Sequence, residues 1–357
     1  LNMDYPFNLK GILYFPKIKS EFESIEGQVK LYYNQVFVAD NIKEVIPEYL
    51  LMLRGVLDCP ELPLNVSRSY LQNSGYVTKI AAHITKKVAD KLSGMCKTDR
   101  ENYEKYWDDI NPFIKFGCLK DEKFDEKMKD YILYKNLDGK YLTLADCLEE
   151  NKEKHENKIF YVTDEKEQSQ YINMFKANGQ DAIIMSHSID NPFISQEEQK
   201  HENLKFLRID ADVNDTLREE VKEEDKEALK KQEETLTETF KKALGDDKLQ
   251  VKVEKLKDAE ISSMITLSEE TRRMQDMMKM YNMGMDASMF GGSGQVLVLN
   301  ANNKLVQYVL EHTDGENTPK ICEQLYDLAQ LSHGSLTPER MTKFIARSNE
   351  IMGMMLN

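Results

Sequence analysis

No stretch of this 357-residue sequence comes near the roughly 18 consecutive apolar residues that a membrane-spanning helix requires. Positive charge is also scarce, because 48 Lys and Arg residues face 62 Asp and Glu residues, and the formal net charge is −14. A protein that grips a phosphate backbone needs a basic face. We therefore expect a chain that neither crosses a membrane nor binds nucleic acid.

Cysteine and histidine are few and do not cluster. The six histidines show no HExxH spacing, and neither a GxSxG motif nor a paired-carboxylate motif occurs. The cysteines form no CxxC pair, which predicts reduced thiols, no disulfide and no metal site. The five cysteines are Cys59, Cys96, Cys118, Cys147 and Cys322.

The first part of the chain predicts a layered α/β domain. Aromatic and β-branched residues concentrate at 9–15 (LKGILYF) and 29–38 (VKLYYNQVFV), which indicates two strands of one sheet. Pro47 is placed to open a short helix that ends at Gly55. A longer helix is expected after Pro63, so strands and helices mix here.

Two charged stretches follow a different pattern. Residues 86–130 carry short apolar faces between charged faces, which is typical of helices. We interpret them as a helical connector, with the single tryptophan, Trp107, in its core. Residues 211–231 have very few apolar side chains, and we expect a solvated linker that leads into a helix.

Between these stretches the pattern predicts a right-handed βαβ unit with parallel strands. The turn after its first strand is Asp164-Glu165-Lys166, which has no glycine-rich cradle and has an acid where a phosphate would sit. A structural α/β subdomain is therefore expected in place of a nucleotide site. Its strands are expected at 158–163, 181–186 and 204–210.

The last part predicts an α+β domain whose two terminal helices begin with Thr-Pro, an N-cap followed by proline in the first turn. The GGSG turn at 291–294 lacks a following Lys-Ser/Thr and is not a phosphate-binding loop. The expected elements are a helix at 236–244, strands at 249–256 and 295–300, and helices opening at Thr318-Pro319 and Thr337-Pro338.

The terminal helices carry apolar stripes with little sequence left to cover them. Burying a large apolar side chain is worth roughly 1.5–3 kcal/mol, and eight of them would offset the estimated ~4–15 kcal/mol lost on association. We predict that two copies meet in a two-fold symmetric four-helix bundle. The predicted dimerisation residues are Ile321, Leu325, Leu328, Leu331, Phe344, Ile345, Ile351 and Met352.

The predicted fold class is mixed α/β. An α/β/α layered domain with a helical connector and a small βαβ subdomain precedes an α+β dimerisation domain. The expected segments are residues 1–85, 86–130, 131–215 and 216–357.

One helix start carries a candidate anion site. Asn65, Arg68 and Gln72 follow an i, i+3, i+7 spacing, which places them on one face at the positive end of the helix expected after Pro63. A guanidinium beside two amides offers fixed donors to an anion. The spacing alone is equally that of an ordinary surface arginine.

A resemblance to a known family decides between an anion site and an ordinary surface arginine. The segments VFVADN (36–41), IPEYL (46–50) and LRGVLDCPELPLNVSR (53–68) closely resemble the middle domain of the heat-shock protein 90 chaperones, of the bacterial type called high-temperature protein G. The resemblance implies that Arg68 is catalytic and reaches the γ-phosphate of ATP held in a separate N-terminal domain. Asn65 and Gln72 would support it. Ser69 departs from the acidic residue that the family commonly carries there.

The resemblance implies further properties of the whole protein. ATP and Mg would bind in the upstream domain, so this chain, which opens at Leu1, is expected to be a segment of a longer ATPase and to bind no cofactor and hydrolyse no ATP alone. Its partners would be a second copy, the N-terminal domain and non-native client proteins. The chain ends without an acidic or ER-retention tail, which favours a cytoplasmic stress-response chaperone.

A methionine-rich segment is the candidate client surface. Seven of the eighteen methionines lie within 274–289, and a helical face there holds no Leu, Ile or Val. Flexible Met is common on surfaces that bind many partners, and the resemblance implies client contact here, but a core stripe stays an open alternative. The client-binding candidates are Met274, Met277, Met278, Tyr281, Met285 and, in place of a family tryptophan, Phe193.

A second function remains open beside the ATP-dependent chaperone. The same stripes and dimer helices would suit a free-standing dimeric holdase or scaffold without ATP coupling. An upstream ATP-binding domain in the gene would favour the chaperone.

Overall fold

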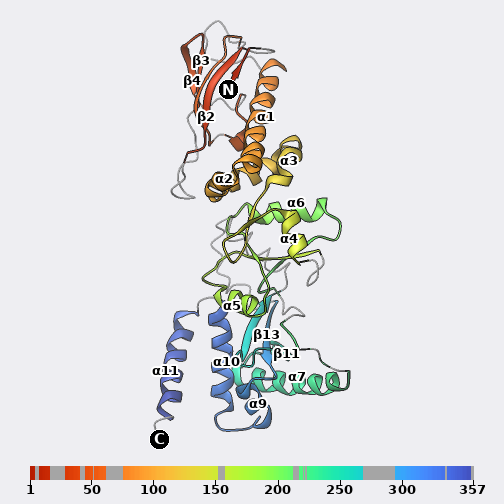
Figure 1. The fold of residues 1–357 in the computed structure, drawn as a ribbon. Coiled ribbons are helices and arrows are strands. Elements are labelled where there is room, and N and C mark those ends of the chain that lie inside the picture. Colours follow the sequence, from red (N-terminus) through yellow and green to blue (C-terminus); the bar gives the residue numbers. More distant parts are fainter. Residues whose placement is uncertain are drawn as a thin grey trace. The chain divides into compact units, whose positions relative to one another are not determined.

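The computed structural model describes residues 1–4, 8–16, 29–40, 45–50, 52–61, 75–151, 157–211, 217–219, 221, 223–267, 294–333 and 336–354. The chain divides into two compact units (Figure 1). The N-terminal unit comprises Leu1–Lys135, Gly139–Glu156 and Pro192–Asn203, and the C-terminal unit comprises Asn136–Asp138, Asn157–Asn191 and Leu204–Asn357. The mixed α/β class is confirmed, whereas the four predicted segments stay a prediction.

A five-stranded sheet forms one layer of the N-terminal unit, in the order β1-β2-β5-β3-β4. Only the β3–β5 pair is parallel, while β1–β2, β2–β5 and β3–β4 are antiparallel. Leu9, Leu31 and Leu57 are buried on one face of this sheet. The strands are β1 (Asn2–Met3), β2 (Leu9–Tyr14), β3 (Val29–Tyr33), β4 (Val36–Asp40) and β5 (Arg54–Asp58).

Two sequence predictions for this sheet were wrong. The single strand predicted for 29–38 is a hairpin, because Asn34 and Gln35 take positive φ angles of 48° and 65° and reverse the chain. The helix predicted to end at Gly55 is only the 3₁₀ turn η1 (Glu48–Leu50). Gly55 lies in strand β5 with φ of 146°, where an added Cβ would come within 1.9 Å of the Ile12 carbonyl oxygen.

Helices make up most of the rest of the N-terminal unit, and residues 86–130 are largely helical, as predicted. Trp107 is buried, as expected, and its indole N–H donates to the Leu133 carbonyl at 2.8 Å. Asp121 caps α3 by accepting hydrogen bonds from the backbone N–H groups of Lys123 and Phe124. The remaining elements are α1 (Gly75–Thr98), α2 (Arg100–Lys120), α3 (Glu122–Met128), η2 (Lys129–Tyr131), the pair β6 (Tyr134–Lys135) and β7 (Tyr141–Leu142), α4 (Leu144–Asn151) and α6 (Asp190–Lys200).

The C-terminal unit contains two three-stranded sheets, ordered β10-β8-β9 and β11-β13-β12. The first is parallel throughout, which confirms the predicted βαβ unit. Residues from both sheets share one core, in which Phe160 and Val162 join Met264 and Val298. The strands are β8 (Lys158–Val162), β9 (Ile183–Ile184), β10 (Lys205–Arg208), β11 (Gln250–Glu254), β12 (Ser263–Leu267) and β13 (Gln295–Asn300).

The helices of this unit are α5 (Ser169–Ala177), α7 (Glu223–Leu244), α9 (Lys304–Glu311), α10 (Thr318–His333) and α11 (Pro338–Met354). The two terminal helices are confirmed. The charged stretch predicted as a linker up to residue 231 already belongs to α7, which begins at Glu223. Within the described residues, no helix is both long and apolar enough to cross a membrane.

Candidate functional site

The predicted catalytic residues Asn65, Arg68 and Gln72 lie outside the described residues, which stop at Glu61 and resume at Gly75. The structure therefore does not test their roles. The structure does describe the residues on either side of this segment, up to Glu61 and from Gly75 onward.

Those two flanks are tied to each other. The Tyr76 hydroxyl, in the first turn of α1, donates a hydrogen bond to the Glu61 carboxylate. Burial, followed by the hydrogen bond and negative charge of Glu61, raises the pKa of Tyr76, so the phenol keeps its proton and remains a donor. Cys59, two residues before Glu61, is buried and anchors the strand side. A hydrogen bond thus joins the described residues on either side of the segment that carries Arg68.

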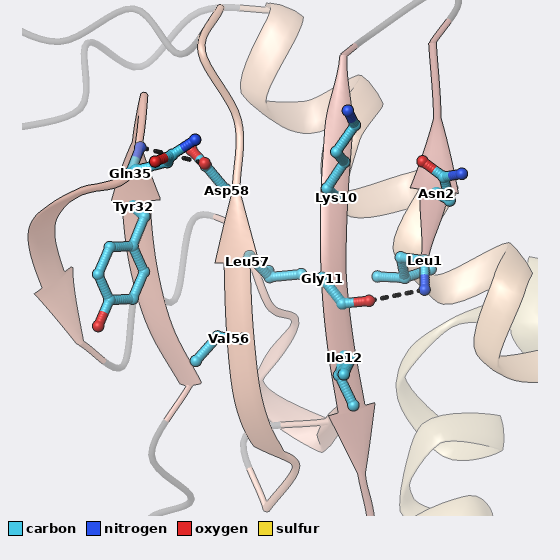
Figure 2. Close-up of a pocket in the computed structure, with 10 residues that line it drawn as sticks. All are labelled: Leu1, Asn2, Lys10, Gly11, Ile12, Tyr32, Gln35, Val56, Leu57 and Asp58. Atoms are coloured by element: carbon cyan, nitrogen blue, oxygen red, sulfur yellow. Dashed lines mark hydrogen bonds between the residues drawn. The ribbon is translucent and has the colours of Figure 1, made fainter.

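A hollow of about 620 Å³ lies on the solvent-facing side of the five-stranded sheet (Figure 2). Ile12 and Val56 face each other across β2 and β5 and are 69% and 42% exposed. Two residues further along the strands, Lys10 pairs with Asp58, whose Oδ2 accepts the backbone N–H of Gln35 at 3.1 Å. A hollow that is lined by the Lys10 ammonium, the Asp58 carboxylate and apolar side chains such as Ile12 and Val56 does not fit a nucleotide phosphate.

The turn after β8 is the place where a βαβ unit would bind a nucleotide phosphate. Its backbone N–H groups are already hydrogen-bonded to side chains of the same turn. The Asp164 carboxylate accepts the N–H groups of Lys166 and Glu167 at 2.8 and 3.0 Å. The side-chain oxygen of Gln168 accepts those of Thr163 and Asp164 at 2.8 and 3.0 Å. The chain's own side chains thus take the donors that a bound phosphate would need.

The described residues also bear on the expected metal and thiol chemistry. No group of three or more potential ligands among His, Cys, Asp and Glu comes together within them. All five cysteines are buried, and none of them forms a disulfide. Burial raises the pKa of the Cys322 thiol to about 12, so this thiol stays protonated and unreactive near neutral pH.

Of the predicted client-binding residues, only Phe193 lies within the described part of the chain. Met274, Met277, Met278, Tyr281 and Met285 lie outside the described residues. Phe193 is described, and the surface role predicted for it was wrong: its side chain is 1% exposed, and the ammonium of Lys115 lies 5.7 Å from its ring centroid. The prediction rested on the tryptophan that relatives carry near this position, and such a resemblance does not show how deeply a side chain is buried.

The eight predicted dimerisation residues divide into three groups. Leu325 is fully buried and belongs to the core of the C-terminal unit, so its inclusion in an intermolecular face was wrong. Leu328, Ile345 and Met352 are 41%, 52% and 56% exposed. The half-buried group consists of Ile321, Leu331, Phe344 and Ile351.

Two polar centres of the C-terminal unit were not predicted from the sequence. Asn300 is completely buried at the end of β13, and Arg347 is 7% exposed in the middle of α11. An arginine interrupting the apolar stripe of a terminal helix was a visible signal for the second. The sequence offered no comparable signal for the first.

Comparison with known proteins identifies the family. The Hsp90 protein family matches residues 2–357. The chaperone protein HtpG of Bacteroides thetaiotaomicron is 39% identical over 333 residues, which cover 90% of this chain and 48% of that protein. The HtpG proteins of Porphyromonas gingivalis and Borrelia garinii are 36% and 29% identical, over 93% and 95% of this chain and 49% and 53% of their own lengths.

The chain belongs to the Hsp90 family, and it spans about half the length of the curated relatives it matches. The resemblance to bacterial heat-shock protein 90 chaperones is confirmed.

Proposed function

We propose that this chain is the client-binding and dimerising part of an ATP-dependent chaperone. The observation that carries the proposal is the family match along residues 2–357, together with relatives that are themselves named chaperone proteins. Non-native polypeptides expose apolar surface, and the methionines concentrated at 274–289 have adaptable side chains that suit many such partners.

We place ATP and Mg in a domain outside this chain. Neither the hollow on the sheet nor the turn after β8 offers a phosphate a cradle of backbone N–H donors. The contribution of this chain would be the guanidinium of Arg68, which can neutralise charge on a phosphoryl group in transfer. The tie between Glu61 and Tyr76 would hold the flanks of its segment in place.

The proposed partner of the terminal helices is a second copy of this chain. Leu328, Ile345 and Met352 are each about half exposed in one copy. Covering them would recover roughly half of the ~1.5–3 kcal/mol per side chain that full burial provides. Six such side chains in a two-fold interface would then contribute about 5–9 kcal/mol, within the range of the cost of association.

Sedimentation equilibrium of the 357-residue chain at micromolar concentration tests this assembly. We expect a dimer, and we expect Ile345→Ser with Met352→Ser to shift it towards monomer. Leu305→Ser is the matched control, because Leu305 is 48% exposed on α9, outside the stripe. A monomeric wild-type chain would contradict the proposed dimer.

Suppression of aggregation of a heat-denatured model enzyme tests the chaperone activity itself. We expect the chain to reduce light scattering at stoichiometric concentration. A stable dimer that leaves aggregation unchanged would instead support the scaffold hypothesis.

A further inference from the structure

Helix α11 is attached to the C-terminal unit by polar contacts. Among the described side chains of α11, Arg347 is the only buried one. The apolar core of the unit takes Cys322, Leu325 and Ala329 from α10, but none of the core residues comes from α11. Phe344 and Ile351 are half-buried on the face that carries Arg347, and the directional contacts on this face are made by charged and polar residues.

The guanidinium of Arg347 reaches three residues of α10. Its Nη1 lies 2.6 Å from the Glu323 carboxylate, and its Nη2 donates to the Glu323 carbonyl at 3.2 Å. Its Nε donates to the side-chain oxygen of Gln324 at 2.9 Å. Nη2 also bonds Oδ2 of Asp327, which is 3% exposed. A planar guanidinium group that is hydrogen-bonded in several directions fixes both the position and the rotation of the helix that carries it.

A second arginine binds the other oxygen of the same carboxylate. Arg340 Nε donates to Asp327 Oδ1 at 3.0 Å, and its Nη2 lies 2.8 Å from that atom. The Arg340 guanidinium also lies over the Tyr326 ring, 4.6 Å from the centroid. Since Arg340 and Arg347 are seven residues apart, they share one face of α11, and Asp327 joins both to α10.

The two exposed apolar side chains of α11, Ile345 and Met352, lie on another face of the helix. Ile345 precedes Arg347 by two positions and Met352 follows it by five, which turns both by well over a right angle from the arginine. Both are more than half exposed. The face that carries Arg347 thus binds α10, while Ile345 and Met352 are presented outward.

We infer that Arg347, Asp327 and Arg340 form an orientation clamp that sets the angle of α11 on α10 before a second copy binds. The inference rests on the proposed dimer for its purpose, although the clamp itself lies within one subunit. A buried ion pair contributes little net stability compared with apolar packing, but a misplaced helix would leave a buried charge unpaired. The clamp therefore selects one arrangement of the apolar stripe.

The first test measures the position of α11 within one subunit. Spin labels at Lys304→Cys on α9 and Lys343→Cys on α11 occupy exposed positions, and the five native cysteines are buried. Mixing with excess unlabelled protein restricts the measured distance to one subunit. We expect a narrow distribution for the wild-type background and a broad one with Arg347→Met. An unchanged narrow distribution would overturn the clamp, whatever the oligomeric state.

Two further variants separate orientation from stability. Lys320→Met is the matched control, because Lys320 joins α11 through Glu350 at 2.6 Å at the surface, and it should leave the distribution narrow. Arg347→Met combined with Asp327→Leu removes both charges and should regain melting temperature while the distribution stays broad. A wild-type distribution in that double variant would overturn the clamp, since packing alone would then orient α11.

Sedimentation equilibrium adds the link to assembly. With a dimeric wild type, Arg347→Met should raise the dissociation constant about tenfold or more, whereas Lys320→Met should not. A dimer unaffected by Arg347→Met would refute the assembly role of the clamp. A monomeric wild type would refute the proposed dimer instead, and the distance measurement would still decide whether the clamp exists.

Discussion

The carboxamide of Asn300 ties strand β13 to the segment between β11 and β12. Its Oδ1 accepts the backbone N–H groups of Leu256 at 3.0 Å and Asn302 at 3.1 Å. Its Nδ2 donates to the carbonyls of Asp258 at 2.9 Å and Ile261 at 2.7 Å. Both N–H donors of this fully buried side chain and both lone pairs of its oxygen are thus bonded to backbone groups.

Asn300→Ala would remove all four bonds and leave backbone groups of Leu256 and Ile261 buried without that partner. A buried polar group left unsatisfied costs about 1–3 kcal/mol, so these two alone predict a loss of about 2–6 kcal/mol. That is a large share of the ~5–15 kcal/mol by which a domain is stable. Asn302→Ala is the control, because its Nδ2 makes one part-buried bond, to the Leu256 carbonyl at 2.9 Å.

Urea denaturation followed by far-UV circular dichroism measures the effect, with the two units treated as separate transitions. Trp107 belongs to the N-terminal unit, so its fluorescence reports on that unit alone. We expect Asn300→Ala to lower the midpoint of the transition that does not change tryptophan fluorescence, and Asn302→Ala to lower it by much less. A free energy of unfolding within about 1 kcal/mol of wild type would refute the reasoning from unsatisfied groups.

Three other perturbations address the proposed function and one helix start. Arg68→Ala in the full-length protein should cut ATP turnover by about 10³-fold or more with a much smaller change in nucleotide affinity, and a wild-type rate would remove Arg68 from the mechanism. Replacing Met274, Met278 and Met285 with serine should weaken suppression of aggregation without a large drop in melting temperature, whereas a large drop would identify a core stripe. Hydrogen bonds from the side chain and backbone of Thr143 lower the pKa of Asp146 at the start of α4. The stability that this carboxylate contributes is present above its unfolded pKa and is lost as the pH falls through the lowered folded pKa. Asp146→Asn should therefore cost about 0.3–1 kcal/mol near neutral pH and nothing in strong acid, and an equal cost at both pH values would exclude the carboxylate charge as the cause.

The elements that the sequence predicted well are those whose signals are local. The terminal helices begin with Thr-Pro and carry a 3.6-residue apolar period, and both were found within a residue of the expected start. The βαβ unit was equally clear, because short apolar strands alternate with a helical pattern. In these segments the propensity of the chain and its tertiary packing favour the same structure.

The elements that were missed depend on contacts elsewhere in the chain. Strand β12 reads SMITL and is buried at all five positions, so it shows no alternation by which a strand is recognised. Gly55 looks like a helix terminator, but its role is to let β5 approach β2 at the Ile12 carbonyl. Helix α9 was missed although Asn303 caps it by accepting the N–H of Leu305 at 2.9 Å, a start signal that the sequence does contain.

The candidate site was predictable only in part, for a related reason. Spacing can place Leu325 and Leu328 on one helix, but it cannot tell which of them the subunit's own core will use. Leu325 is taken by that core, and Leu328 is left 41% exposed. Phe193 shows the same limit, since an aromatic side chain carries no mark that separates a surface contact from an interior one.

The two terminal helices divide the tasks of folding and proposed assembly between them. Helix α10 gives Cys322, Leu325 and Ala329 to the core of its own subunit, so changing Cys322 or Leu325 must disturb folding first. Helix α11 gives that core none of its described side chains and presents Ile345 and Met352 outward. Because Arg340 and Arg347 bind α10 from a face that Ile345 and Met352 do not share, substitutions at these two positions should leave the subunit's packing intact and change only what the exposed face meets.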